Sequence, residues 1–208
     1  QKIKSYTGSF DKVVNYIKDM GLNKEKDLGE LEISSSMTND IEFRNVSYRY
    51  KNSNNNALSD ISFVVPVNSI TAVVGPSGSG KSTLIDLMVR IRQVDSGSIC
   101  IDDNNINEFK LKHLRTIISY VPQSPQIFYG AIINHIKYGN SNITDNEIEN
   151  AANLAGAHDF INELENKYNT YLDEGAINLS GGQKQRLDLA RVLLKHGDIL
   201  IFDEPTSN

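Results

Sequence analysis

The chain has 208 residues, a formal net charge of −5 and one cysteine. The single Cys100 excludes a disulfide framework within the chain and suits a reducing cytoplasm, while the mild acidity argues against broad non-specific binding of nucleic acid. The length is sufficient for one domain with a sizeable core. The sequence has no run of about 18 apolar residues that would span a bilayer.

The N-terminal third begins with a helical pattern and continues into strands. Residues 1–20 carry apolar side chains at helical spacing with Lys and Asp opposite, which predicts an amphipathic helix. Residues 21–40 are rich in Lys, Glu, Ser and Asn, and we expect a linker. Residues 41–66 favour strands interrupted by the polar loop 52–56. The apolar positions of the first helix are Ile3, Tyr6, Phe10, Val13, Val14, Ile17 and Met20.

A glycine-rich loop follows next. The apolar run 70–74 predicts a strand, apolar side chains from Leu84 onward predict a helix, and 97–101 predicts another strand. Residues 75–83 lie between the first strand and the helix, a context typical of loops that hold nucleotide phosphates. We call them the phosphate loop; its members are Gly75, Pro76, Ser77, Gly78, Ser79, Gly80, Lys81, Ser82 and Thr83.

The residue types of the phosphate loop suit a polyphosphate. Glycines at 75, 78 and 80 allow a tight turn that points successive backbone N–H groups inward. The positive end of the helix that begins near Lys81 also favours an anion. We expect Lys81 to reach the β- and γ-phosphates, and the Ser82 hydroxyl to ligate Mg²⁺.

The middle of the chain combines one further strand with a predicted helical region. The apolar run 117–122 ends at Gln123, a neutral amide that can touch both Mg²⁺ and a water molecule from a strand end. Residues 124–178 are predicted to be mostly helical. They contain a helix over 144–155, opened by a capping box, and a further helix over 157–165.

The sequence Leu-Ser-Gly-Gly-Gln at 179–183, which we call the signature segment, predicts the start of another helix. Ser180 is a good N-cap, and the two glycines after it leave the N–H groups of the first turn uncovered, which favours an anion. In the helix that follows, Asp188 either pairs with an arginine such as Arg191 or Arg92 or faces water. We expect it to face water.

The last residues form an apolar run that ends in two carboxylates. Residues 199–202 predict a buried strand, and ligands gather at the carboxyl ends of such strands. Asp203 is then placed to hold Mg²⁺. Glu204 lies one residue further and is the candidate general base for an attacking water molecule.

These motifs occur together in a known family: the chain resembles the nucleotide-binding domain of an ABC transporter over residues 41–208. The matching motifs are the Walker A loop (75–82), the Q-loop (Gln123), the signature (179–183) and Walker B (199–203) with Glu204. The resemblance implies an α/β fold of the P-loop NTPase class. Its RecA-like core sheet is flanked by helices, with an N-terminal antiparallel β subdomain and an inserted α-helical subdomain at about 124–190.

The resemblance also implies a role for each motif residue. Catalysis would fall to Glu204, Gln123 and Lys81, and Mg²⁺ would be held by Ser82, Gln123 and Asp203. ATP would contact the phosphate loop and an aromatic side chain that corresponds to Tyr50, with Tyr48 as its rival. The signature residues Ser180, Gly181, Gly182 and Gln183 would act in trans, on the ATP of a second domain.

Two segments point to an exporter within this family. Residues 126–136 resemble the exporter segment that helps receive the coupling helices, and 173–176 lie where exporters carry an acidic–glycine motif. Residues 174–180 are similar to bacterial exporters of peptides and bacteriocins. Residues 1–20 then resemble the cytoplasmic end of the last transmembrane helix, the alternative being an ordinary amphipathic helix packed on the domain.

We therefore expect an ATPase that powers export through ATP-driven dimerisation at the cytoplasmic face of the cell membrane. Its expected partners are a second ABC ATP-binding domain and a transmembrane domain of the same or a partner chain, and not nucleic acid. The alternative is a soluble ABC-type ATPase acting on DNA or ribosomes. The chain stops at Asn208, before the family's switch histidine, so we expect the 208 residues alone to hydrolyse ATP slowly or not at all.

Overall fold

The computed structural model describes residues 27–32, 38–140, 142–173, 175–195 and 197–203. The predicted helix over 1–20, most of the predicted linker and Glu204 lie outside these residues. The helices are α2 (Lys81–Met88), α3 (Leu111–Ile117), α4 (Ile132–Ile136), α5 (Asp145–Leu154), α6 (His158–Glu163) and α7 (Gly181–Leu194). The strands are β1 (Ile41–Tyr48), β2 (Leu58–Val65), β3 (Ser96–Ile101), β4 (Asn104–Asn105), β5 (Ile118–Val121), β6 (Gly130–Ala131), β7 (Tyr171–Leu172) and β8 (Ile199–Phe202).

An antiparallel sheet forms the first part of the structure. β1 pairs with β2 on one side and β3 on the other, and the strand order is β2-β1-β3-β4. The strands predicted over 41–66 and 97–101 and the antiparallel subdomain are therefore confirmed. At the start of β3, Gly97 has φ 81°, and a Cβ there would lie 2.3 Å from the Asn45 carbonyl oxygen, so this close approach requires glycine.

β5 and β8 form a parallel pair, with Ile118 opposite Ile199 and Val121 opposite Phe202. Both apolar runs are thus confirmed as strands, but the predicted burial of 199–202 holds only in part, because Leu200 and Phe202 are 43% and 45% exposed. Side chains from this pair, from α2 and α3 and from the antiparallel sheet share one hydrophobic core, whose most buried members include Val46, Leu87, Ile99, Ile101 and Leu114. Because the two strands run in the same direction, the residues that follow them meet at one edge.

The strand predicted over residues 70–74 is absent. This segment connects β2 to α2 outside any sheet, and Ile70 and Val74 are 102% and 88% exposed. An apolar run becomes a strand only where a neighbour supplies backbone hydrogen bonds. Among the described residues, β5 and β8 pair only with each other and β2 ends the antiparallel sheet, so this segment has no such neighbour.

The four helices α4 to α7 form a second lobe with its own core, which includes Ile132, Ile136, Ile148, Ile161 and Leu187. The two helices predicted in this region are confirmed as α5 and α6. The capping box at the start of α5 is also confirmed, because Glu147 and Thr144 bond reciprocally through their side chains and backbones.

The prediction that residues 124–178 are mostly helical is wrong. Residues 124–129 form neither helix nor strand, and β6 pairs with β7 in a small antiparallel ladder. Pro125 lacks a backbone N–H, and Gly130 has φ 130°, a value open to glycine but not to helical residues. These two residues keep the segment out of a helix.

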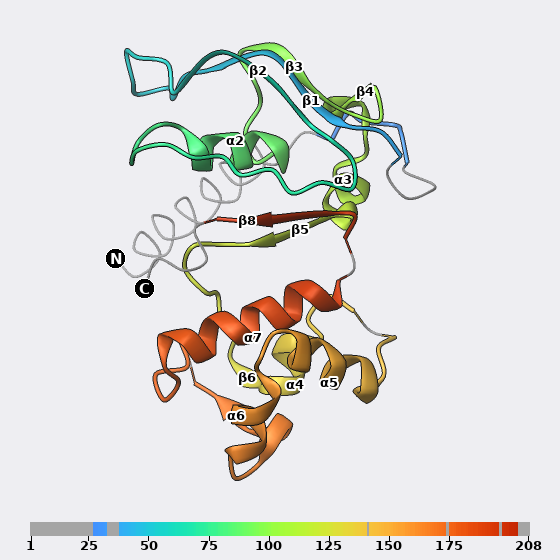
Figure 1. Ribbon diagram of the computed structural model, residues 1–208, viewed down its shortest axis with the longest axis vertical. Helices are drawn as coiled ribbons and strands as arrows, with labels where there is room; N and C mark the ends of the chain where they lie inside the picture. Colours follow the sequence, from blue (N-terminus) through green and yellow to red (C-terminus); the bar gives the residue numbers. More distant parts are fainter. Residues whose placement is uncertain (1–26, 33–37, 141, 174, 196, 204–208) are drawn as a thin grey trace, which may run out of the picture.

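The antiparallel sheet and α2 make up the first lobe, and α4 to α7 make up the second. The two lobes lie on opposite sides of the β5–β8 pair. Figure 1 shows the antiparallel sheet and α2 at one end of the molecule, β5 and β8 in the middle, and α7 with α4, α5 and α6 at the other end. The phosphate loop and the signature segment therefore belong to different lobes.

Candidate functional site

The phosphate loop takes its shape from glycines with positive φ. Gly78 and Gly80 have φ values of 79° and 94°. At Gly80 a Cβ would also lie 2.8 Å from the carbonyl oxygen of Ala57 and 2.7 Å from Leu58, whereas at Gly78 nothing lies within 4 Å. Gly80 is therefore fixed both by backbone conformation and by the close approach of β2.

The loop ends at the start of α2, which carries no side-chain cap. Its positive end therefore faces the loop, an arrangement that favours an anion. Lys81 is the first residue of α2, and its Nζ donates to the carbonyl oxygens of Gly75 at 2.9 Å and Pro76 at 3.2 Å. These bonds hold the ammonium group over the loop.

The loop residues line a cavity of about 440 Å³ together with side chains from two other elements. Tyr50 follows β1, and its hydroxyl lies 3.0 Å from the Thr83 Oγ1, while the Arg92 guanidinium lies 4.7 Å from the ring centre. Tyr48, its rival, is buried in the core and does not line the cavity. The full lining is Tyr50, Ala57, Gly75, Ser77, Gly78, Gly80, Lys81, Ser82, Thr83 and Gln123.

Gln123 and Asp203 reach the same edge of the β5–β8 pair. The parallel register continues past the strands, because the Asp203 backbone N–H donates to the Val121 carbonyl oxygen at 3.0 Å. The Tyr120 hydroxyl donates to Asp203 Oδ2 at 3.3 Å. Burial, and then the Asp203 carboxylate, raise the pKa of Tyr120 to about 12, so its proton is retained at neutral pH.

No sequence pattern indicated a role for Tyr120, which lies inside an apolar run. Its hydroxyl fixes the direction of the Asp203 side chain, a contact between residues 83 positions apart in the chain. Only the parallel pairing of the two strands brings these residues together.

The signature segment starts α7 with a capping box. The Ser180 Oγ accepts from the Gln183 N–H at 3.2 Å, and the Gln183 Oε1 accepts from the Ser180 N–H at 2.9 Å. Ser180 is thus confirmed as the N-cap. The two glycines after it are exposed, with nothing within 4 Å of a Cβ built on either. None of Ser180, Gly181, Gly182 and Gln183 lines the cavity of the phosphate loop.

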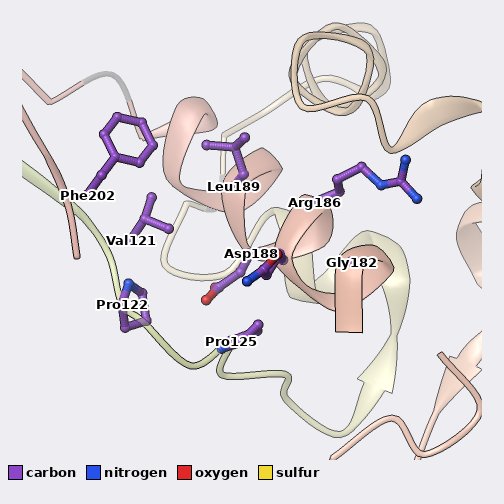
Figure 2. A pocket seen from close by; sticks show the side chains of 9 residues that line it. Val121, Pro122, Pro125, Gly182, Arg186, Asp188, Leu189 and Phe202 are labelled. Carbon is purple, nitrogen blue, oxygen red and sulfur yellow. The ribbon is translucent and has the colours of Figure 1, made fainter. Parts of the chain in front are cut away.

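A second, mostly apolar cavity of about 280 Å³ lies between the lobes, among residues of β5, β8, α7 and the segment after Gln123. Figure 2 shows Asp188 in its wall, on α7 beside Pro125. The expectation that Asp188 faces water is wrong, because the residue is 1% exposed. Its carboxylate accepts from the Arg191 Nε at 2.8 Å and from the Gln126 backbone N–H at 3.2 Å. The arginine one turn further along α7 makes burial of this charge possible.

Two kinds of feature are absent from the described residues. No group of three or more His, Cys, Asp or Glu side chains there is arranged to hold a metal ion. No helix in that part of the chain has the length and apolar character needed to cross a bilayer.

Comparisons with known proteins agree on one family. The sequence profile described as "ABC transporter" matches residues 58–207. An ATP-dependent lipid A-core flippase from Photorhabdus laumondii is 42% identical over 189 residues, which are 90% of this chain and 32% of the flippase. The ABC transporter B family member 14 of Arabidopsis thaliana is 44% identical over 169 residues, 81% of this chain and 14% of that protein.

A solved structure is also similar. It is described as a bacterial Atm1-family ABC exporter with ATP bound, and it matches with a TM-score of 0.81 and 32% identity over 97% of this chain and 36% of the exporter. The chain therefore spans about a third of the length of the flippase and of the exporter.

Proposed function

The chain belongs to the ABC transporter family, as an ATP-binding domain of the exporter type, and from this premise we propose that it binds and hydrolyses ATP to drive export by a membrane protein. The single observation that supports the site is the cavity of about 440 Å³ in which the phosphate loop, Tyr50 and Gln123 come together. The named relatives are a flippase, a transporter and an exporter, which favours export over a soluble ATPase acting on DNA or ribosomes.

ATP fits the residues present. The glycine turn and the uncapped start of α2 supply backbone N–H groups to the phosphates. The Lys81 ammonium exchanges its carbonyl partners in the loop for the β- and γ-phosphate oxygens. Tyr50, at the rim of the same cavity, offers a ring face to the adenine.

Mg²⁺ also fits, because the side chains in question are oxygen donors. The Ser82 hydroxyl and the Gln123 amide oxygen line one cavity, and the Asp203 carboxylate lies at the same edge of the β5–β8 pair. A bound Mg²⁺ would neutralise charge on the phosphate oxygens. Tyr120 holds the Asp203 carboxylate in place for this purpose.

Hydrolysis further requires a base and a partner. Glu204, which lies outside the described residues, is our candidate to take a proton from the attacking water, with Gln123 orienting that water. Ser180, Gly181, Gly182 and Gln183 are exposed or half-buried on the other lobe, where a second ABC domain can reach them. We infer that they cover the γ-phosphate bound by that domain, so that ATP closes the dimer and hydrolysis opens it.

The remaining partners follow from the exporter assignment. A transmembrane domain, in the same or a partner chain, would receive the motion of the dimer, and the chain would then lie on the cytoplasmic face of the cell membrane. The transmembrane domain would also select the cargo.

The proposal is tested by Lys81→Met in the full-length protein, a change that removes the charge and keeps most of the apolar stem. A charged hydrogen bond contributes roughly 1.5–3 kcal/mol, so ATP affinity should fall by about 10-fold or more and ATPase activity with it. Equilibrium binding of a fluorescent ATP analogue measures the first quantity and phosphate release the second. Lys112→Met, on the exposed surface of α3, is the matched control and should bind ATP normally. Unchanged affinity in Lys81→Met would refute the nucleotide site.

A further inference from the structure

One buried carboxylate is not used by the site described above. Asp188 lies in α7, two turns after Ser180, and is 1% exposed. A carboxylate removed from water costs several kcal/mol unless charges and hydrogen bonds replace its hydration. Arg191 supplies the charge, through Nε at 2.8 Å and a second contact from Nη2. This pair explains how the charge is tolerated, but it could form equally well on the surface of the helix.

The other partner of Asp188 lies outside α7. The backbone N–H of Gln126 donates to Asp188 Oδ2 at 3.2 Å. Gln126 is three residues after Gln123, and the intervening segment forms neither helix nor strand. Pro125 has no backbone N–H to donate. Gln126 is the next residue, so its N–H is the first one available after that proline. Asp188 therefore holds the segment that carries Gln123 against α7.

Neighbouring contacts extend this attachment by two residues. The Phe128 N–H donates to His135 Nδ1 of α4 at 3.4 Å, and the Arg191 guanidinium lies 5.8 Å from the centre of the Phe128 ring. Arg191 thus contacts both Asp188 and the same segment. Figure 2 shows the close approach, with Asp188 between the body of α7 and the chain at Pro122 and Pro125.

We propose that Asp188 is a positioning residue for ATP hydrolysis: it anchors the chain after Gln123 on the helix that begins at Ser180. The side chain of Gln123 then holds its place in the cavity, and the signature segment moves with it as one body. Asp188 does not line the cavity of the phosphate loop and acts only through this anchor. This inference rests on the proposed ATPase function.

The geometry predicts a particular kinetic effect. ATP is held mainly by the phosphate loop, which Asp188 does not touch, whereas Gln123 acts on the water and the metal ion during reaction. A displacement of about 1 Å in such a group lowers rates by up to about 100-fold. Loosening the anchor should therefore lower kcat and leave the KM for ATP nearly unchanged.

The test is Asp188→Asn in the full-length protein, assayed alone and in a Gln123→Ala background. Alone, kcat should fall by about 10-fold with KM within about twofold. In the Gln123→Ala background the same change should alter kcat by less than about twofold, because two residues that act through one group are not additive. Equal losses in both backgrounds, the result expected from partial unfolding, would overturn the positioning role. Asp159→Asn, an exposed aspartate of α6, is the control and should keep full activity.

A second variant covers the case in which Asp188→Asn does not fold. Asp188→Leu combined with Arg191→Met removes both charges and leaves no unpaired ion in the interior. This double variant should show the same loss of kcat. A stable double variant with wild-type kcat overturns the positioning role while the wild-type ATPase stands. If the full-length wild type hydrolyses no ATP, the proposed function fails and this inference fails with it.

Discussion

At the scale of single residues, the least typical environment is that of His135 in α4. The side chain is 2% exposed, its Nδ1 accepts from the Phe128 N–H, and among the described residues nothing bonds to its Nε2. Burial, and to a lesser degree the Arg191 charge, lower the pKa of His135 to about 4, although the Asp188 carboxylate acts in the opposite direction. The imidazole is therefore neutral in the folded protein across the physiological range of pH.

We expect the domain to lose stability as the pH falls from about 6.5 to about 4. The unfolded chain protonates His135 near pH 6.5 and the folded state only near pH 4, so the stabilisation is complete above 6.5 and is lost as the pH falls through this window. The loss between pH 7.5 and pH 5 should be about 2 kcal/mol. Urea unfolding at the two pH values measures it. His135→Met should reduce this pH dependence, and a variant that kept the full loss of stability would contradict the assignment to His135.

At the scale of elements, α2 owes its start to a single glycine. Gly80 combines a left-handed backbone with a close approach to β2, whereas Gly78, two residues earlier, has the first property and an open surrounding. Comparing Gly78 with Gly80 therefore separates the effect of a left-handed backbone from the effect of packing against Leu58 and Ala57. The start of α2 is therefore tied to the antiparallel sheet.

Gly80→Ala should destabilise the protein more than Gly78→Ala. A left-handed alanine costs about 1 kcal/mol at either position, and at Gly80 the new methyl group also has to displace Leu58 or Ala57, which adds roughly 1–3 kcal/mol. Thermal or urea unfolding of the two variants gives the comparison, with Gly78→Ala as the matched control. Equal destabilisation would show that packing against β2 does not matter.

Local signals in the sequence predicted local structure correctly. The capping box of α5, the Ser180 N-cap of α7 and the strands of the apolar runs at β5 and β8 are confirmed, since each depends on residues close together in the chain. Two of the three failures, the strand at 70–74 and the exposure of Asp188, have a different cause. The run 70–74 needed a pairing strand, and the burial of Asp188 needed a backbone N–H from 62 positions away. Neither requirement is visible in a single stretch of sequence.

In the candidate site, too, some residues could be predicted from the sequence and others only from the fold. The phosphate loop could be identified from its spacing and Gln123 from the resemblance to ABC transporters, and the structure brings them to one cavity. The part played by Tyr120 could not, because it follows from the parallel register of two strands. The choice between Tyr50 and Tyr48 likewise needed the fold, which buries one and leaves the other at the cavity.

At the scale of the whole molecule, the phosphate loop and the signature segment lie in different lobes, on opposite sides of the β5–β8 pair (Figure 1). The signature residues do not line the cavity of the phosphate loop, so the chain cannot complete the proposed site by itself in this arrangement. Under the proposed function, a second copy or a related domain would supply the missing face. Binding and turnover should therefore respond differently to a change in the signature segment.

Ser180→Arg should leave ATP binding within about threefold of wild type and reduce hydrolysis to background. The long charged side chain obstructs the face that meets the partner but is remote from the cavity of its own chain. It also removes a helix cap, at a cost of about 1 kcal/mol. Thr144→Arg removes the corresponding capping box from α5 and controls for that cost. Strongly weakened binding in Ser180→Arg alone would mean that the signature acts on its own chain's nucleotide.

The exposed segment 70–74 has a consequence for the protein during its synthesis. Its sequence, Ile-Thr-Ala-Val-Val, is uncharged, rich in β-branched side chains and free of proline, and its backbone is unpaired. Segments of this kind readily add to the strands of other chains and are typical sites of aggregation and of chaperone binding. On the ribosome, this stretch would therefore need protection from the strands of other chains.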